Sequence, residues 1–346
     1  MLKVGIVGYG YAGRGIHSYL VQQTSGLQLA AVVATSEEKR LQAQKEYGVK
    51  TYSRIEDLLK DPDIDLVIIA TPHYLHAPQA ILTLQAGKHC VIDKVMCMTS
   101  SEAIAIIEAA EKNRVLLSVF QNRRWDWDFL TLKKALSTRL IGEPFRFESR
   151  ASRYRPPKQI WRTQKTSMGG ILFDWGSHLI DQALQLITEP LENIYCHISN
   201  RYWPIDIGTH CQLILTFAND IVFEIEISYL CCAKRPRWTV LGTEGAITQY
   251  GLDPQEAAIL AGDLNQAVEN PENKMQITYV KNAETFQQPF DTVRGSWVEY
   301  YQNIAEVIQG KAELIVKPRQ VLQQILILEA AMQSALTGKI VSNLYR

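Results

Sequence analysis

Two groups of side chains in this sequence have the types and spacing needed to move a proton. Lys94 follows a short apolar run, and Asp174 lies four residues before His178. A lysine partly buried beside a ligand can take part in acid/base chemistry or polarise an oxygen. A carboxylate one helical turn before a histidine can orient the imidazole and raise its basicity. The three side chains are therefore candidates for acid/base catalysis; the alternatives are an exposed loop lysine and an ordinary surface ion pair.

The aspartate and the histidine belong to a segment with a helical pattern that runs to about Ile187. Polar residues recur at spacings of three or four, which places them on one stripe of a helix. They are Asp174, His178, Asp181 and Gln185. The remaining positions are mostly apolar, so the polar stripe faces either solvent or a cleft.

A glycine-rich turn lies near the start of the chain. It consists of Gly8, Tyr9, Gly10, Tyr11, Ala12 and Gly13. The turn follows an apolar run at residues 4–7 and opens a helical segment, which is the context that a dinucleotide-binding loop requires. The first glycine permits a tight turn, the second lets the backbone approach a pyrophosphate, and the third lets the helix pack on the strand. We interpret the turn as a dinucleotide site rather than a purely structural turn.

The apolar run at residues 29–33 lacks the acidic residue that usually follows this strand in sites for NAD. It is followed by Ala34, Thr35 and Ser36. Glu37 and Glu38 come later and fit the first turn of a helix, where they favour its dipole. Small hydroxyl residues followed by Lys39 and Arg40 leave room for a 2′-phosphate, which favours NADP over NAD. The alternative is that the two basic residues are solvated helix charges.

Polar residues follow two further apolar runs, residues 66–70 and 90–92. They are Thr71, Pro72, His73 and His76 after the first run, and Asp93 and Lys94 after the second. Ligands of an open α/β sheet bind beyond the carboxyl ends of its strands, so we expect these residues to line the cofactor cleft. A metal pair of His73 and His76 is the alternative, but no carboxylate or thiolate is near them in sequence, and no metal is expected.

The predicted secondary structure that positions these residues differs between the first and second parts of the chain. Up to residue 121, short apolar runs alternate with helical segments, which predicts an α/β Rossmann domain with a doubly wound parallel sheet. The second part, residues 122–346, contains longer alternating strands at residues 145–149, 210–217, 221–229, 238–242 and 246–250. They predict a mainly antiparallel sheet in an α+β domain. A tight turn is expected at Asn219 and Asp220, loop and edge at residues 251–289, and helices at 297–309 and 319–337.

Composition excludes several classes of partner. The 346 residues carry 36 basic and 36 acidic side chains, so there is no electrostatic case for nucleic acid or an anionic membrane. No signal segment or membrane span is expected. The six cysteines form no C-x-x-C pair, which fits a cytoplasmic compartment.

With these motifs in order, the chain resembles the glucose–fructose oxidoreductase and inositol dehydrogenase family over essentially its whole length. The resemblance rests on GIVGYGYAGRG, DPDIDLVIIATP, AGKHCVIDK, GGILFDWGSHLID and GTEGAI. It implies a Rossmann domain followed by a domain with a large open sheet, used for a homodimer or homotetramer. The family's active-site lysine matches Lys94, and its Asp-x-x-x-His pair matches Asp174 and His178. The segment QNRRWDWDFLTLKK is most similar to the NADP-preferring scyllo-inositol dehydrogenase branch.

The resemblance implies hydride transfer between a nicotinamide and a small polyol, sugar or related carbonyl compound. Candidate substrate contacts are Arg124, Tyr154, Trp161 and Arg162. Two positions depart from the family motif: Asp93 replaces a glutamate, and Val95 replaces a proline, which restores an amide and leaves Lys94 less rigidly aimed. The alternatives are a catalytically silent sensor that binds the dinucleotide and regulates a partner, and an enzyme that uses NAD within a glycosidase cycle.

Overall fold

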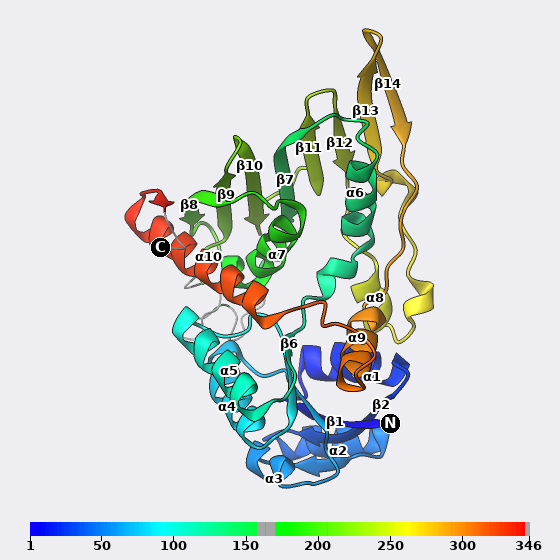
Figure 1. Cartoon of the computed structure of the whole chain (residues 1–346), viewed down its shortest axis with the longest axis vertical. Helices are drawn as coiled ribbons and strands as arrows, with labels where there is room; N and C mark the ends of the chain where they lie inside the picture. Colours follow the sequence, from blue (N-terminus) through cyan, green and yellow to red (C-terminus); the bar gives the residue numbers. More distant parts are fainter. Residues whose placement is uncertain (158–162, 164–169, 206, 343–346) are drawn as a thin grey trace. The chain divides into compact units, whose positions relative to one another are not determined.

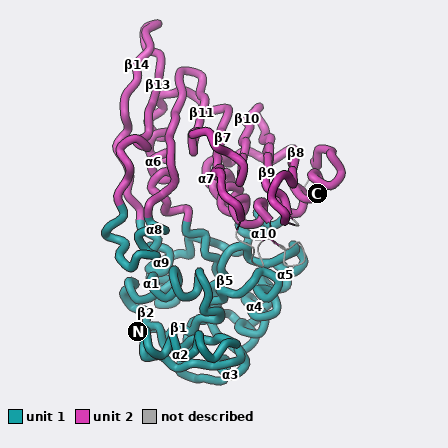
Figure 2. The backbone as a smooth tube through the Cα atoms, turned by 180° about the vertical axis from the view of Figure 1, so that it is seen from behind, with its two compact units in different colours: residues 1–122, 255–267, 296–325 teal, residues 123–254, 268–295, 326–346 magenta. Residues whose placement is uncertain are grey.

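The computed structural model describes residues 1–157, 163, 170–205 and 207–342 (Figure 1). They form two compact units, coloured separately in Figure 2. Unit 1 contains residues 1–122, 255–267 and 296–325, and unit 2 contains residues 123–254, 268–295 and 326–346. The first change of unit lies beside the expected boundary at residue 121. The two later segments that belong to unit 1 have no counterpart in the sequence pattern.

Unit 1 is built on a six-stranded sheet in which all neighbouring strands are parallel, in the order β3-β2-β1-β4-β5-β6. The strands are β1 (Leu2–Val7), β2 (Leu27–Val33), β3 (Lys50–Tyr52), β4 (Leu66–Ile69), β5 (His89–Ile92) and β6 (Leu117–Val119). The predicted doubly wound parallel sheet is confirmed. Strand β3 was not predicted, because Lys-Thr-Tyr at the edge of the sheet forms no apolar run.

Helical elements connect the strands of unit 1 and continue in its two later segments. They are η1 (Gly13–His17), α1 (Ser18–Gln23), α2 (Glu37–Tyr47), α3 (Ile55–Leu59), η2 (His73–Leu75), α4 (His76–Gln85), α5 (Ser100–Asn113), α8 (Gln255–Leu260), η7 (Leu264–Gln266), α9 (Val298–Ile308) and the start of α10 (Pro318–Thr337). The segment η1 is a π-helical turn that leads from the glycine turn into α1.

Unit 2 contains a nine-stranded sheet in the order β14-β13-β12-β11-β7-β10-β9-β8-β15, in which only β7 and β10 are parallel neighbours. The strands are β7 (Pro144–Ser152), β8 (Leu191–Ser199), β9 (His210–Phe217), β10 (Ile221–Ser228), β11 (Trp238–Gly242), β12 (Gly245–Gln249), β13 (Gln276–Lys281), β14 (Glu284–Pro289) and β15 (Val341–Ser342). The helical elements are η3 (Asn122–Trp125), α6 (Trp127–Ser137), η6 (Leu172–Gly176), α7 (Ser177–Leu186) and η8 (Pro271–Asn273).

Two details of unit 2 test the sequence pattern. The tight turn between β9 and β10 is confirmed, since Phe217 lies opposite Ile221, and Asn219 and Asp220 have φ values of 63° and 59°, which asparagine and aspartate tolerate in turns. Of the loop and edge expected at residues 251–289, the edge is confirmed, since β13 and β14 end the sheet, whereas the loop is wrong for α8. Every residue of β14 is exposed, and its sequence, Glu-Thr-Phe-Gln-Gln-Pro, has no apolar alternation that could indicate a strand.

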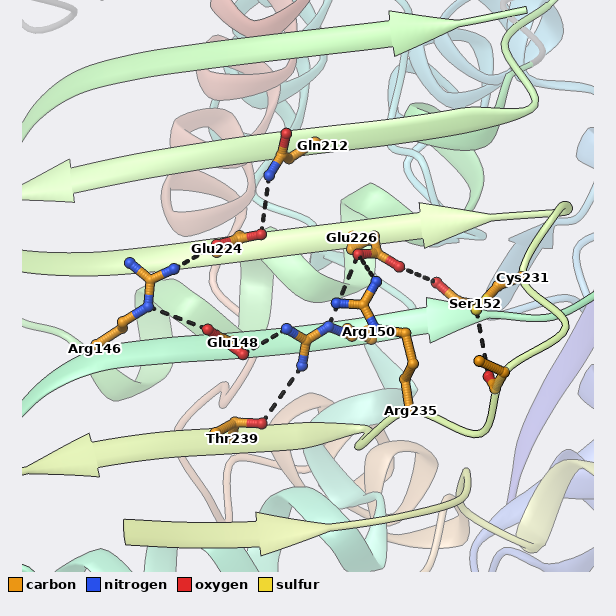
Figure 3. A network of polar contacts seen from close by, with 11 residues as sticks. Arg146, Glu148, Arg150, Ser152, Gln212, Glu224, Glu226, Cys231, Arg235 and Thr239 are labelled. Atoms are coloured by element: carbon orange, nitrogen blue, oxygen red, sulfur yellow. Dashed lines mark hydrogen bonds and ion pairs between the residues drawn. The ribbon is translucent and has the colours of Figure 1, made fainter. Parts of the chain in front are cut away.

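One face of the nine-stranded sheet is apolar and the other is charged. Phe147, Phe223 and Trp238 point to the buried face. The alternating positions of β7 and β10 form the charged face (Figure 3), which consists of Arg146, Glu148, Arg150, Glu224 and Glu226. Arg146 bonds to Glu148 at 3.1 Å and to Glu224 at 2.7 Å. Arg150 bonds to Glu148, and Arg235 bonds to Glu226. The charges on this face therefore neutralise one another.

No helix among the described residues is both long enough and apolar enough to cross a bilayer.

Candidate functional site

The glycine turn follows β1, and its three glycines have different surroundings. A Cβ on Gly8, which has a φ of 100°, would lie 2.4 Å from the Ala70 carbonyl oxygen. A Cβ on Gly13 would lie 1.8 Å from the Gly8 carbonyl oxygen, whereas a Cβ on Gly10 would meet nothing within 4 Å. The fold therefore requires glycine at the first and third positions. The open space at Gly10 fits the approach of a pyrophosphate to the backbone.

The side chain of Tyr9 holds the glycine turn to the end of α2. Tyr9 is 3% exposed, and its hydroxyl donates to Glu46 at 2.6 Å. Arg14 donates to the same carboxylate through Nε and Nη2, at 3.0 and 2.7 Å. The Arg14 guanidinium is the main reason that the pKa of Glu46 is lowered to about 2, while burial and then Glu46 raise the pKa of Tyr9. Since the Tyr9 side chain is bonded to α2, Tyr9 contributes its backbone to the inner side of the glycine turn.

Two other residues of the turn differ in their contacts. Tyr11 is 52% exposed, and its hydroxyl donates to Glu256 of α8 at 2.8 Å. Ala12 precedes η1 and makes no side-chain cap bond. The turn is therefore fastened to α2 through Tyr9 and to α8 through Tyr11.

The end of β2 carries a basic side chain that is bonded to the backbone. Arg40 Nη1 donates to the carbonyl oxygens of Ala34 at 2.8 Å and Thr35 at 2.9 Å. Ser36 caps α2, with its hydroxyl accepting from the Lys39 amide at 3.5 Å. The first turn of α2 contains Glu37 and Glu38, as expected. Arg40 is therefore held at the end of β2 and is not a freely solvated helix charge.

The segment after β4 places both expected histidines in the interior. His73 is 2% exposed and His76 is 0% exposed. The Nδ1 of His76 lies 2.7 Å from the Val95 carbonyl oxygen, and its Nε2 lies 2.8 Å from the Thr71 carbonyl oxygen. Pro72 precedes η2, and the Thr71 hydroxyl donates to Gln79 at 2.7 Å. His76 thus bonds the backbone on both sides, which leaves no ring nitrogen for a metal.

Asp93 and Lys94 follow β5. Asp93 is 8% exposed, and its Oδ1 accepts from the Lys94 amide at 2.8 Å. Burial alone would raise the pKa of Asp93, but His17, Lys94 and His76 hold it well below its ordinary value. Lys94 is half-buried, and its peptide bond to Val95 is cis. The backbone of the candidate lysine is therefore fixed by an ionised, buried carboxylate.

His17 is a residue of this region that the sequence analysis missed. It ends η1, is 0% exposed, and places Nε2 3.8 Å from Asp93 Oδ1. Its Nδ1 lies 2.6 Å from the Tyr301 hydroxyl, on α9. A single histidine in an apolar helical segment carries no signal of this role, and Tyr301 is 284 residues away along the chain.

In unit 2, Asp174 and His178 lie where a π-helical turn, η6, passes into α7. The spacing of four therefore spans a wider turn than the regular helix assumed from sequence. Asp174 is half-buried, while His178 is 5% exposed and Asp181 is 3% exposed. The polar stripe is therefore largely interior, and the alternative of a solvent-facing stripe is wrong for His178 and Asp181.

Buried polar bonds hold α7 in place. Arg124 is 6% exposed and grips Asp181 through Nε at 2.8 Å and Nη2 at 2.7 Å. Gln182 donates to the Arg123 carbonyl oxygen at 3.0 Å and accepts from Arg237 at 2.9 Å. Burial lowers the pKa of the Arg237 guanidinium, and Asp128, 3.1 Å away, opposes that shift. The sequence alone gave no sign that Arg237 and Gln182 anchor the helix that carries His178.

The four residues predicted to contact a substrate differ in their surroundings. Arg124 lies in the buried pair with Asp181, which occupies two of its three nitrogens. Tyr154 is 51% exposed. Trp161 and Arg162 lie outside the described residues. Their contacts with a substrate remain predictions, as does the pairing of Lys94 in unit 1 with Asp174 and His178 in unit 2.

Comparisons with known proteins cover both parts of the chain. Residues 2–121 match the family described as "Oxidoreductase family, NAD-binding Rossmann fold", and residues 129–248 match "GFO/IDH/MocA C-terminal domain". The chain is 34% identical over 345 residues to "Uncharacterized oxidoreductase YdgJ" of Escherichia coli (strain K12), covering 96% of each chain. It is 32% identical over 347 residues to "scyllo-inositol 2-dehydrogenase (NADP(+)) IolW" of Bacillus subtilis (strain 168), covering 96% of this chain and 94% of the relative.

Among solved structures, the chain is similar to an NAD-binding protein from Listeria innocua. The sequence identity is 30%, the TM-score is 0.87, and the match covers 100% of this chain and 98% of the other.

The glycine turn generates a paired prediction. Gly13→Ala should destabilise the protein by about 1–3 kcal/mol, because the new methyl group collides with the Gly8 carbonyl. Gly10→Val should leave the free energy of unfolding nearly unchanged but abolish NADPH binding, because its side chain fills the open space. Denaturant unfolding and fluorescence titration measure the two effects. A folded Gly10→Val protein with undiminished NADPH affinity would remove the dinucleotide site from this turn.

Proposed function

This chain belongs to the GFO/IDH/MocA oxidoreductase family, and from that premise we propose that it transfers a hydride between a nicotinamide and a polyol, sugar or related carbonyl compound. The observation that carries the proposal is the environment of the three candidate residues. Lys94 is fixed beside a buried carboxylate, and His178 is buried on an anchored helix one turn after Asp174. Inositols are the first substrates to test, since one relative is named as a scyllo-inositol 2-dehydrogenase.

The proposed chemistry needs a proton route as well as a hydride route. A bound nicotinamide would accept the hydride when an alcohol is oxidised, so the hydroxyl proton must go to a protein group. His178 takes that proton, oriented by Asp174, while Lys94 holds the oxygen as the C=O bond forms. In the reverse direction His178 returns the proton. The backbone amides of the glycine turn would hold the pyrophosphate of the cofactor.

We also propose that NADP is preferred over NAD. The end of β2 carries no carboxylate at Ala34, Thr35 or Ser36, and Arg40 is bonded to the first two carbonyls. A guanidinium held there can pair with a 2′-phosphate. The relative IolW is named as an NADP(+) enzyme, which is consistent with this preference.

We further propose that the chain forms a homodimer or homotetramer through the charged face. Its ion pairs are mutual, so a second copy can cover them without leaving an unpaired buried charge. Ile214 and Leu241 lie on the same face, opposite Glu224 and Arg146 respectively. Apolar side chains between paired charges suit the core of an interface.

The cofactor preference is tested by dissociation constants. NADPH should bind more tightly than NADH, and Arg40→Ala should weaken NADPH by about tenfold, because a charge-assisted hydrogen bond is lost. Ser36→Asp should shift the preference toward NAD by placing a negative charge near the 2′-phosphate. Lys45→Ala, at an exposed position in the last turn of α2, is the matched control and should change little. A clear preference of the unmodified protein for NADH would show that the end of β2 was misinterpreted.

The oligomer is tested by light scattering. The measured mass should be two or four times the 39.2 kDa of one chain. Ile214→Arg should lower it, because a charge without a partner would be buried between copies. Leu41→Arg is the control, since Leu41 is 58% exposed on α2 of unit 1. An unmodified protein with the mass of one chain contradicts this proposal.

The chemistry is tested by turnover of an accepted substrate. His178→Ala and Lys94→Ala should each lower kcat by at least about 100-fold while the affinity for NADPH changes little, because a positioned acid or base is lost. The double variant should lose much less than the product, since the groups act as a unit. His197→Ala, an exposed histidine of β8, is the control.

Two outcomes of that experiment count against the proposal. Near-normal turnover in either single variant places the proton route elsewhere. Tight NADPH binding without turnover of any substrate favours the sensor, and Val95→Pro then becomes the restoration experiment.

A further inference from the structure

His76 makes two contacts that an uncharged imidazole cannot satisfy together. Its two ring nitrogens lie 2.7 and 2.8 Å from the carbonyl oxygens of Val95 and Thr71. Both are ordinary distances for an N–H donating to an oxygen. We propose that His76 is a permanently protonated imidazolium that ties the loop carrying Lys94 to the loop after β4, and so acts as a positioning residue for Lys94.

The argument rests on counting donors. A neutral imidazole has one N–H and one lone pair, whereas the imidazolium has two N–H groups. A carbonyl oxygen accepts hydrogen bonds and has none to give. With a neutral ring, one of the two contacts would set a nitrogen lone pair against a carbonyl lone pair in the interior, where an unsatisfied acceptor is costly. Only the protonated ring satisfies both carbonyls.

A buried cation needs a nearby negative charge, and Asp93 supplies it. His76 is 0% exposed, and it is among the groups that lower the pKa of Asp93. The other titratable groups around this pair are Lys94, His17 and His73, whose ring centroid lies 5.5 Å from that of His76. The negative charge of Asp93 lowers the cost of burying the charge on His76, and the Lys94 ammonium beside the same carboxylate opposes this effect.

The two tied loops are neighbours in the sheet. Strand β4 pairs with β5, with Ile69 opposite Ile92, so the segments that follow both strands leave the sheet at the same edge. Thr71 follows the first strand, and Val95 comes directly after Lys94. His76 bonds one carbonyl of each segment and so fixes the backbone directly after Lys94. Asp93 fixes the backbone before it by accepting from the Lys94 amide. The link to Lys94 rests on the proposed function; the protonation of His76 does not.

Unit 1 also contains a histidine, His89, whose hydrogen bond requires a neutral imidazole. His89 begins β5, and its Nδ1 accepts from the Leu116 amide at 2.9 Å, so that nitrogen carries no proton. Burial lowers the pKa of His89. His89 is therefore the internal reference for a neutral ring.

The protonation is tested by nitrogen NMR of the full-length protein labelled with 15N-histidine, with His76→Gln and His89→Gln used to assign the signals. His76 should show two protonated nitrogens from about pH 6 to about pH 9, well above the ordinary histidine pKa of ~6.5. His89 should show one unprotonated nitrogen over the same range. An unprotonated nitrogen on His76 at neutral pH overturns the proposal, whatever the activity of the protein.

The positioning role is tested in the same variants. Glutamine cannot donate to both carbonyls in the ring's geometry, so His76→Gln should lower kcat by about 10- to 100-fold through misplacement of Lys94. His89→Gln, which keeps an acceptor for Leu116, should leave kcat unchanged. Unchanged kcat in a folded His76→Gln protein overturns the positioning role. If that variant does not fold, His76→Asn replaces it in both the NMR assignment and the turnover measurement. If no substrate is turned over, the proposed function fails while the imidazolium stands.

Discussion

The candidate site of unit 1 depends on one constraint, which is that all six strands of its sheet run in the same direction. Parallel strands end at the same edge, so the segments after β1, β2, β4 and β5 meet there. The backbone at that edge is crowded: the Gly8 Cα faces the Ala70 carbonyl, and Gly13 faces the Gly8 carbonyl. Only glycine tolerates these approaches, and they set the path of the turn from β1 into η1.

At this edge, buried ion pairs and hydrogen bonds hold the backbone of each loop in place. Glu46 holds the glycine turn through Tyr9 and Arg14, and Arg40 is held at the end of β2. Asp93 fixes the amide of Lys94. In unit 2, Arg124 and Arg237 anchor α7 in the same manner. Each anchor lies beside a candidate residue and restricts its geometry, because buried hydrogen bonds hold the supporting side chains in one position.

Much of the fold could be predicted from the sequence because its signals are local. The apolar runs that became β1, β2, β4 and β5 were placed within a few residues, since their pattern is encoded in neighbouring residues. The hairpin of β13 and β14 could not be found in this way. Strand β13 pairs with β12 and buries Ile277, whereas β14 is exposed throughout and is held by its pairing with β13.

The candidate site residues also separate into those with a local sequence signal and those set by contacts between distant residues. The sequence by itself determined the glycine turn, the missing carboxylate after β2, and the candidate roles of Lys94, Asp174 and His178, because these depend on residue type and short spacing. Only the tertiary structure decided that Tyr9 bonds to Glu46 and that Arg40 returns to the strand end. It also decided that His17 lies between Asp93 and Tyr301 in unit 1, and that Arg237 bonds the helix that carries His178 in unit 2. These contacts join residues far apart along the chain, and burial, which no local pattern specifies, makes their charges and hydrogen bonds matter.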